Sequence, residues 1–144
     1  MSNSAQDQVR QLLEKGGELE RSGHIQEAIQ AYEASLELEE RPEILQHVGN
    51  LYNQAGRLGD AVRTFQRCVD RMPDFAGGHY GLGLSYYRSA LVQEAIQAFE
   101  RVVELDPAFV TARYWLAIAH FHRGDLDGAI RVYRALLDVA PEFT

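Results

Sequence analysis

Four alanines recur along this chain at intervals of 33, 34 and 34 residues, at Ala28, Ala61, Ala95 and Ala129. An isoleucine or valine follows each alanine directly, and a tyrosine or phenylalanine lies four residues after it. A fixed period of this length is typical of helical solenoids, in which each unit buries its apolar face by stacking against its neighbours. The period therefore restricts the fold to a stack of similar helical units.

Each period contains two apolar blocks separated by a short break. In the third copy the first block includes Leu82 and Tyr86. The second block is spaced by four, three and four residues, which is one face of an α-helix, and its members are Val92, Ile96, Phe99 and Val103. The break at 88–90 is long enough only for a tight turn, so the two helices are expected to be antiparallel neighbours.

Glycine and proline mark where these helices end. Glycine stands in the short break of three copies, where a left-handed residue ends a helix at low steric cost, at Gly23, Gly56 and Gly124. Proline then follows the second block and stops the second helix, at Pro73, Pro107 and Pro141. The sequence thus predicts paired helices bounded by turns, repeated four times.

This arrangement resembles the tetratricopeptide repeat family, whose 34-residue unit has small residues at positions 8 and 20, aromatic residues at 11 and 24, and proline at 32. Aligned on the four alanines, the repeats span 9–41, 42–75, 76–109 and 110–143, after a short N-terminal extension at 1–8. The match is incomplete, since Leu19 and His120 replace the tyrosine of position 11. The resemblance implies a single all-α domain, a right-handed superhelical solenoid of antiparallel helix pairs.

Composition excludes several classes of function. The net charge is −7, so the chain lacks the basic surface that nucleic acids and anionic membranes require. The longest apolar runs fall well short of a membrane span, and the first residues lack the pattern of a secretory signal. A single cysteine, Cys68, is consistent with the reducing cytoplasm, and every basic residue except Lys15 is arginine, which agrees with a GC-rich bacterial genome.

The family resemblance assigns a concave groove to the first helices of the repeats, and this groove changes character along the chain. Its first half is polar, whereas its second half is aromatic. We predict that the second half binds a partner, through Gly77, Tyr80, Gly81, Leu84, Tyr87, Arg88, Tyr114, Trp115, Ile118, Phe121 and His122. Gly77 and Gly81 are four residues apart on one helical face, which predicts a hollow between the aromatic side chains. Close packing of neighbouring helices is the alternative explanation for these two glycines.

No residues form a convincing catalytic or metal-binding pattern. His120 and His122 are two residues apart, so on a helix they point to different faces, unlike the paired histidines of a zinc helix. Cys68 lies at a position that is normally small and buried, so it is interpreted as a packing residue. We therefore expect no enzyme activity, no metal and no cofactor.

The last repeat has no following repeat to cover it, so we expect an exposed apolar face that includes Ile130, Leu137 and Val139. Three explanations are open: a fragment of a longer array, self-association, or a small tolerated patch. The sequence thus predicts a cytoplasmic, bacterial adaptor that binds a partner protein or peptide in the groove. The alternatives are a scaffold that self-associates through its ends and a secretion-type chaperone for an apolar segment.

Overall fold

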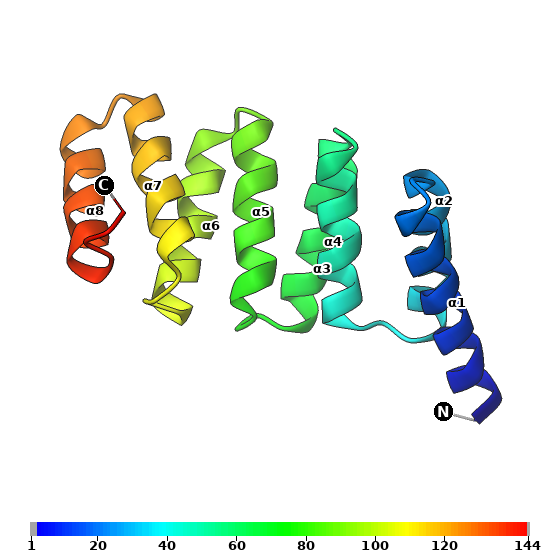
Figure 1. The fold of residues 1–144 in the computed structure, drawn as a ribbon. Coiled ribbons are helices and arrows are strands. Elements are labelled where there is room, and N and C mark those ends of the chain that lie inside the picture. Colours follow the sequence, from blue (N-terminus) through cyan, green and yellow to red (C-terminus); the bar gives the residue numbers. More distant parts are fainter. Residues whose placement is uncertain (1–2, 144) are drawn as a thin grey trace. The chain divides into compact units, whose positions relative to one another are not determined.

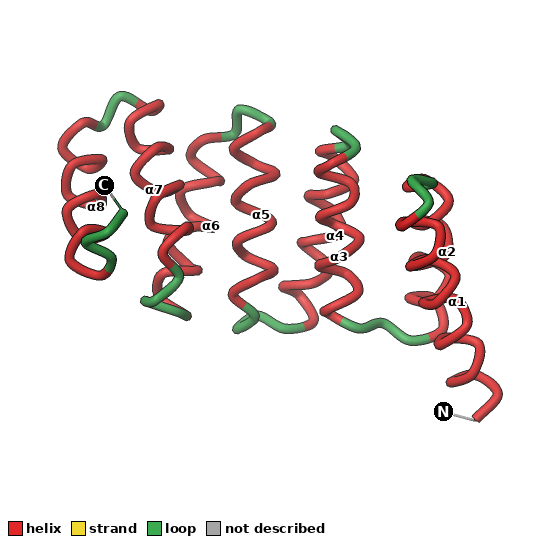
Figure 2. Tube along the Cα trace, in the orientation of Figure 1, coloured by secondary structure: helices red, strands yellow, loops and turns green. Residues whose placement is uncertain are grey.

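The computed structural model describes residues 3–143, and within this range it contains eight α-helices and no strand (Figures 1 and 2). The helices are α1 (Asn3–Arg21), α2 (Ile25–Leu38), α3 (Pro42–Gln54), α4 (Leu58–Arg71), α5 (Ala76–Arg88), α6 (Val92–Leu105), α7 (Val110–Arg123) and α8 (Leu126–Val139). They form two compact units, Met1–Arg71 and Met72–Thr144. The all-α fold predicted from the period is confirmed.

In the first unit α1 pairs with α2 and α3 pairs with α4, while α2 also packs on α3. The small residue of each first helix allows these close contacts. A Cβ on Gly16 would lie 2.7 Å from Tyr32 Cε1, and a Cβ on Gly49 would lie 2.6 Å from Phe65 Cζ. The aromatic ring of the second helix therefore fills the space that glycine leaves in the first. Because α1 begins at Asn3, the residues expected as an N-terminal extension are helical from that point.

The second unit repeats this arrangement. Helix α5 pairs with α6, α7 pairs with α8, and α7 also packs on α6. Its core contains Ile96 and Phe99 of α6 together with Leu116 of α7, all nearly inaccessible to water. A Cβ on Gly83 would lie 2.6 Å from Phe99 Cε1, which is the same contact as in the first unit.

The turn within each repeat has the left-handed backbone that the glycines predict. The φ angles are 83° at Gly23, 76° at Gly56 and 90° at Gly124. The third repeat has Ala90 at this place, with a φ of 65°. The backbone of this turn is thus kept even where the residue has a Cβ, which costs about 1–2 kcal/mol for an L-residue in this conformation.

Candidate functional site

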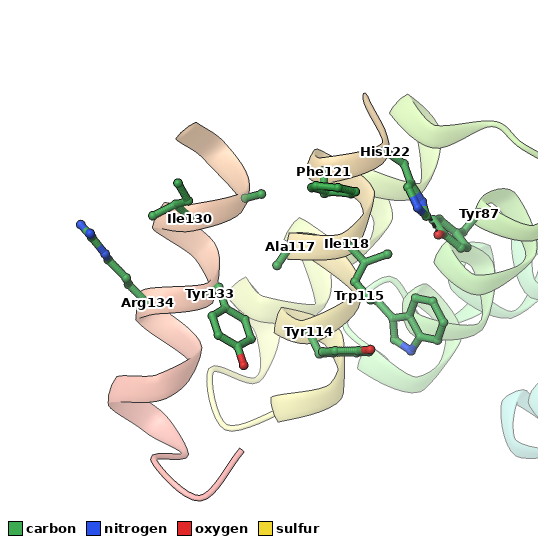
Figure 3. A pocket seen from close by; sticks show the side chains of 11 residues that line it. Tyr87, Tyr114, Trp115, Ala117, Ile118, Phe121, His122, Ile130, Tyr133 and Arg134 are labelled. Carbon is green, nitrogen blue, oxygen red and sulfur yellow. Dashed lines mark hydrogen bonds between the residues drawn. The ribbon is translucent and has the colours of Figure 1, made fainter. Parts of the chain in front are cut away.

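The second unit contains an open apolar cavity of about 780 Å³ between α7 and α8 (Figure 3). Tyr87 at the end of α5 lines one edge. Nine further residues of α7 and α8 carry most of its surface, and Arg134 lies at its outer side. The complete lining is Tyr87, Tyr114, Trp115, Ala117, Ile118, Phe121, His122, Ala129, Ile130, Tyr133 and Arg134.

Six of the eleven residues predicted for the groove line this cavity. They are Tyr87, Tyr114, Trp115, Ile118, Phe121 and His122, and we call them the aromatic groove. The other five do not line it: Gly77, Tyr80, Gly81, Leu84 and Arg88. The cavity therefore lies further along the chain than the hollow predicted at the two glycines.

Trp115 is at the centre of the aromatic groove. Its ring centroid lies 5.3 Å from that of Tyr87 and 5.7 Å from that of Tyr114. Both pairs are tilted or edge-on, which aromatic rings prefer to a face-to-face sandwich. The three rings hold one another in place and give the groove a rigid apolar wall.

Tyr87 is also fixed by His122. The two rings are stacked with centroids 5.6 Å apart, and Tyr87 Oη is hydrogen-bonded to His122 Nδ1. Burial raises the pKa of Tyr87, and the nearby Tyr114 raises it further. Tyr87 therefore stays neutral at physiological pH and presents its ring as an apolar contact surface.

The residues after α8 close one edge of the groove. The Phe143 ring lies 5.4 Å from that of Tyr114, and the Tyr133 hydroxyl donates a 3.4 Å hydrogen bond to the Phe143 carbonyl. Tyr80 and Phe109, 34 residues earlier in each case, make the matching contact at 4.8 Å. Tyr80 also lies 6.0 Å from Phe99, so its ring packs into the core of the unit.

The remaining predicted groove residues all lie on α5. Gly81 is buried and Gly77 is half-buried, while Leu84 packs against the core of the unit. Arg88 is exposed in the last turn of the helix. The partner-binding role predicted for these residues stays a prediction.

Large apolar side chains face solvent around the cavity. Phe121 is 58% exposed and Ile130 is 50% exposed. Among the described residues that line the cavity, Arg134 alone carries a charged side chain, and His122 adds an imidazole. The cavity thus combines an apolar floor with two side chains, Arg134 and His122, that can donate hydrogen bonds to a carboxylate or carbonyl oxygen.

The predicted apolar end face is present on α8. Ile130 and Val139 are exposed and Leu137 is half-buried. Leu126, at 56% exposure, and Tyr133, at 37%, lie on the same side of α8 as Ile130 and Leu137, although sequence reasoning missed them, whereas Val139 is exposed on the other side. Tyr133 could have been included from the sequence, because it is the residue of the last repeat that corresponds to Phe99.

Ile130 belongs to both predicted surfaces, since it also lines the cavity. The groove and the end face therefore adjoin one another along α7 and α8.

A metal site finds no support among residues 3–143, where no group of three or more potential ligands lies together. His120 is mostly buried, and its Nδ1 lies 3.1 Å from Asp125 Oδ2. The Gly128 amide donates a hydrogen bond to Asp125 and lowers the pKa of that carboxyl, as His120 does to a smaller extent. These contacts hold the start of α8 against the end of α7, which gives His120 a structural role.

Cys68 is fully buried in α4. Burial raises the pKa of its thiol to about 11, with a further contribution from Glu43. The thiol donates a 3.4 Å hydrogen bond to the Pro42 carbonyl. A neutral, buried thiol is a packing group and a poor nucleophile.

The polar half of the predicted groove contains one connected cluster in the first unit. Glu20 Oε1 accepts hydrogen bonds of 2.9 Å from the Tyr32 hydroxyl and 2.7 Å from His47 Nε2. Burial alone would raise the pKa of Glu20, but the hydrogen bonds from His47 and Tyr32 together hold it below its usual value. This cluster ties α1 to α2 and α3.

No helix within residues 3–143 is both long enough and apolar enough to cross a lipid bilayer. Among solved structures, two crystal structures of MamA are similar to this chain. One is 27% identical with a TM-score of 0.84 and covers 89% of this chain and 75% of its own. The other is 25% identical with a TM-score of 0.89 and covers 95% and 75%.

A tetratricopeptide repeat protein from Parabacteroides merdae ATCC 43184 is 26% identical with a TM-score of 0.83, over 94% of this chain and 53% of that protein. A search among curated proteins found no match.

The tetratricopeptide repeat family model matches residues 13–74, 49–108 and 80–142, three overlapping segments that together span most of the chain. This agrees with the repeated helix pairs and with the small and aromatic residues that fill each pair. The fold is of a protein-interaction scaffold type and not of an enzymatic type. The chain belongs to the tetratricopeptide repeat family.

Proposed function

We propose that this chain is a non-catalytic adaptor that binds a peptide segment of a partner protein in the aromatic groove. One observation carries the proposal: an apolar cavity of about 780 Å³ is lined by six residues of the predicted groove. Phe121 is 58% exposed there, although apolar groups of this size are normally buried. Exposed aromatic clusters of this kind mark interaction surfaces on soluble proteins.

The shape and chemistry of the groove define the segment it would bind. Rigid rings around Trp115 favour one or two large apolar side chains as anchors, because pre-ordered aromatic surfaces lose little entropy on binding. Arg134 and His122 stand at the margins, where a carboxylate next to the anchor would find a partner. We therefore expect a short extended or helical segment that combines large apolar residues with an acidic residue.

We also place this adaptor in the bacterial cytoplasm. The use of arginine in place of lysine supports a bacterial source, as does the likeness to the Parabacteroides merdae protein. The buried, protonated thiol of Cys68 fits a reducing compartment.

Selection of peptides from a displayed library against the immobilised chain tests the binding role. Binding of a selected peptide is then measured by calorimetry with the wild-type chain and with Phe121→Ala and Asn50→Ala variants. Asn50 is exposed on α3 in the polar half, so it serves as the control. The proposal predicts at least about tenfold weaker binding for Phe121→Ala and no change for Asn50→Ala. Equal affinities for all three proteins would move binding away from the aromatic groove.

A further inference from the structure

Helix α8 presents an apolar stripe to solvent. Leu126, Ile130, Tyr133 and Leu137 are spaced by four, three and four residues, so they lie along one side of the helix. The first three are 56%, 50% and 37% exposed, and Leu137 is half-buried. We call these four residues the α8 stripe. A stripe with this spacing is the surface that one helix uses to pack against another.

The preceding repeat shows that this surface accepts a helix. The residues of α6 at the places of Ile130 and Tyr133 are Ile96 and Phe99, which are 2% and 0% exposed. Both belong to the core cluster that contains Leu116 of α7, and the Phe99 ring packs on Gly83 of α5 as well. The α8 stripe is therefore an unfilled docking surface for a helix.

The N-terminal helix of a second copy is a poor occupant. Helix α7 covers α6 with small and apolar residues, Ala112, Leu116 and Ala119, all of which are buried. At the same places of the first repeat, α1 carries Gln11, Lys15 and Glu18, all exposed. Stacking α1 of one copy onto α8 of another would bury the charges of Lys15 and Glu18, and removing charged groups from water costs several kcal/mol. Head-to-tail assembly is thus disfavoured.

The charges beside the α8 stripe favour a second α8. Asp127 and Arg134 are exposed and seven residues apart, two turns along the same flank of the stripe. When two copies of α8 pack antiparallel, Ile130 of one copy lies opposite Tyr133 of the other, and Leu126 lies opposite Leu137. The flank of each helix then meets the same flank of its partner, so Asp127 of each copy faces Arg134 of the other. In a parallel pair this flank would instead face the opposite flank of the partner helix, which carries the apolar residues Ala129 and Leu136, so the two ion pairs would not form.

We propose that two copies of this chain associate through their α8 helices, packed antiparallel about a two-fold axis. The α8 stripes form the apolar centre, and two symmetric Asp127–Arg134 ion pairs set the direction. The contact is self-complementary, so it closes at two copies and does not propagate into a filament. This association goes beyond the proposed peptide binding and does not depend on it.

Charge reversal in solution tests the proposal. Sedimentation equilibrium of the wild-type chain is expected to show a monomer–dimer equilibrium that shifts toward dimer with concentration. Asp127→Arg and Arg134→Asp each replace two attractive pairs with two repulsive ones, so each variant alone should dimerise at least about tenfold more weakly. An equimolar mixture of the two variants restores both attractive pairs, so it should form a heterodimer with near wild-type affinity.

Arg131→Asp is the matched control, because Arg131 is exposed on α8 and lies further round the helix from the stripe than Arg134 does. It changes the net charge as Arg134→Asp does and should leave the dimer intact. Ile130→Glu should abolish the dimer, whereas Trp115→Ala should retain it, and circular dichroism checks that each variant is folded.

Three outcomes would overturn the proposal. One is a wild-type chain that stays monomeric up to its solubility limit. The second is a mixture of the two charge variants that fails to associate. The third is a mass that grows beyond the dimer with concentration.

Discussion

Ile96 and Ile130 occupy the same place in successive repeats, yet Ile96 is 2% exposed and Ile130 is 50% exposed. The difference arises because α7 packs over α6 while no helix within residues 3–143 packs in the same way over α8. The repeat thus buries its second helix only when another helix follows. This dependence leaves the apolar surface that the aromatic groove and the α8 stripe share.

Because Gly83 and Phe99 are in close contact, adding one methyl group at Gly83 should lower the stability of the fold markedly. Gly83→Ala would place a Cβ 2.6 Å from Phe99 Cε1, and the buried ring has no room to move. We expect a loss of about 1–3 kcal/mol in the free energy of unfolding, measured by urea denaturation. Gly59→Ala is the control, because that Cβ meets only Arg63 at 3.7 Å and alanine favours the helix, so it should stabilise by about 0.5–1 kcal/mol. Destabilisation by both variants to the same degree would argue against the packing explanation.

Ala90 predicts a gain in stability from a glycine. Its φ of 65° lies in the left-handed region, where a Cβ costs about 1–2 kcal/mol. Glycine removes this strain but loses more entropy on folding, so Ala90→Gly should stabilise by about 0.5–1 kcal/mol. Ala55 ends α3 with a φ of −80°, so Ala55→Gly should instead destabilise. Thermal unfolding should show a higher melting temperature for Ala90→Gly and a lower one for Ala55→Gly. A lower melting temperature for Ala90→Gly would contradict the claim that Ala90 is strained.

Cys68 is expected to be almost inert in the folded chain. With its pKa raised to about 11 by burial, only about a thousandth of the thiol is ionised at pH 8, against about a quarter for an ordinary cysteine. The rate of labelling with a disulfide reagent should therefore be more than about a hundredfold slower than in guanidinium-unfolded chain. The single cysteine makes the readout unambiguous. Rapid labelling under native conditions would show that α4 opens readily.

Glu20 predicts a specific contribution to acid unfolding. Its pKa is held below the usual 4.5 in the folded chain, because hydrogen bonds from His47 and Tyr32 outweigh the effect of burial. The stabilisation is therefore complete above pH 4.5 and is lost as pH falls through the lower folded value. Glu20→Gln should be less stable at neutral pH and should lose less stability on acidification than the wild-type chain. Glu18→Gln, at an exposed place on the same helix, should leave the acid profile unchanged, and identical profiles for all three chains would contradict the role of Glu20.

The sequence predicts the fold well because the residues that recur in each repeat are those that pack the two helices together. Gly49 with Phe65 and Gly83 with Phe99 are the same contact in successive repeats, so a small residue in one helix and a ring in the next identify each helix pair. The left-handed turns follow from the same repetition, since Gly56 and Gly124 both have positive φ.

The binding surface is less predictable, because a repeat position does not determine which neighbour a side chain meets. Tyr80, predicted for the groove, is half-buried with its ring beside Phe109 and Phe99, and only the fold brings these three rings together. The cavity also extends onto α8 through Ile130 and Tyr133, which the family pattern assigns to packing between repeats. They are exposed because no helix within residues 3–143 packs over α8 as α7 packs over α6, and a repeat motif by itself does not specify its neighbour.

The emission of Trp115 tests the central claim most directly, because it is the only tryptophan of the chain and lies at the centre of the aromatic groove. A selected peptide is titrated into the wild-type chain and into the Asp127→Arg variant, whose cavity lining is unchanged and whose self-association should be weak. Binding in the groove predicts a saturable blue shift of the emission in both proteins, with a midpoint for Asp127→Arg no higher than for the wild-type chain, because a dimer through the α8 stripe would cover Ile130 and Tyr133 of the cavity. Heat of binding in calorimetry without any change in Trp115 emission would contradict the account, because the peptide would then bind outside the aromatic groove.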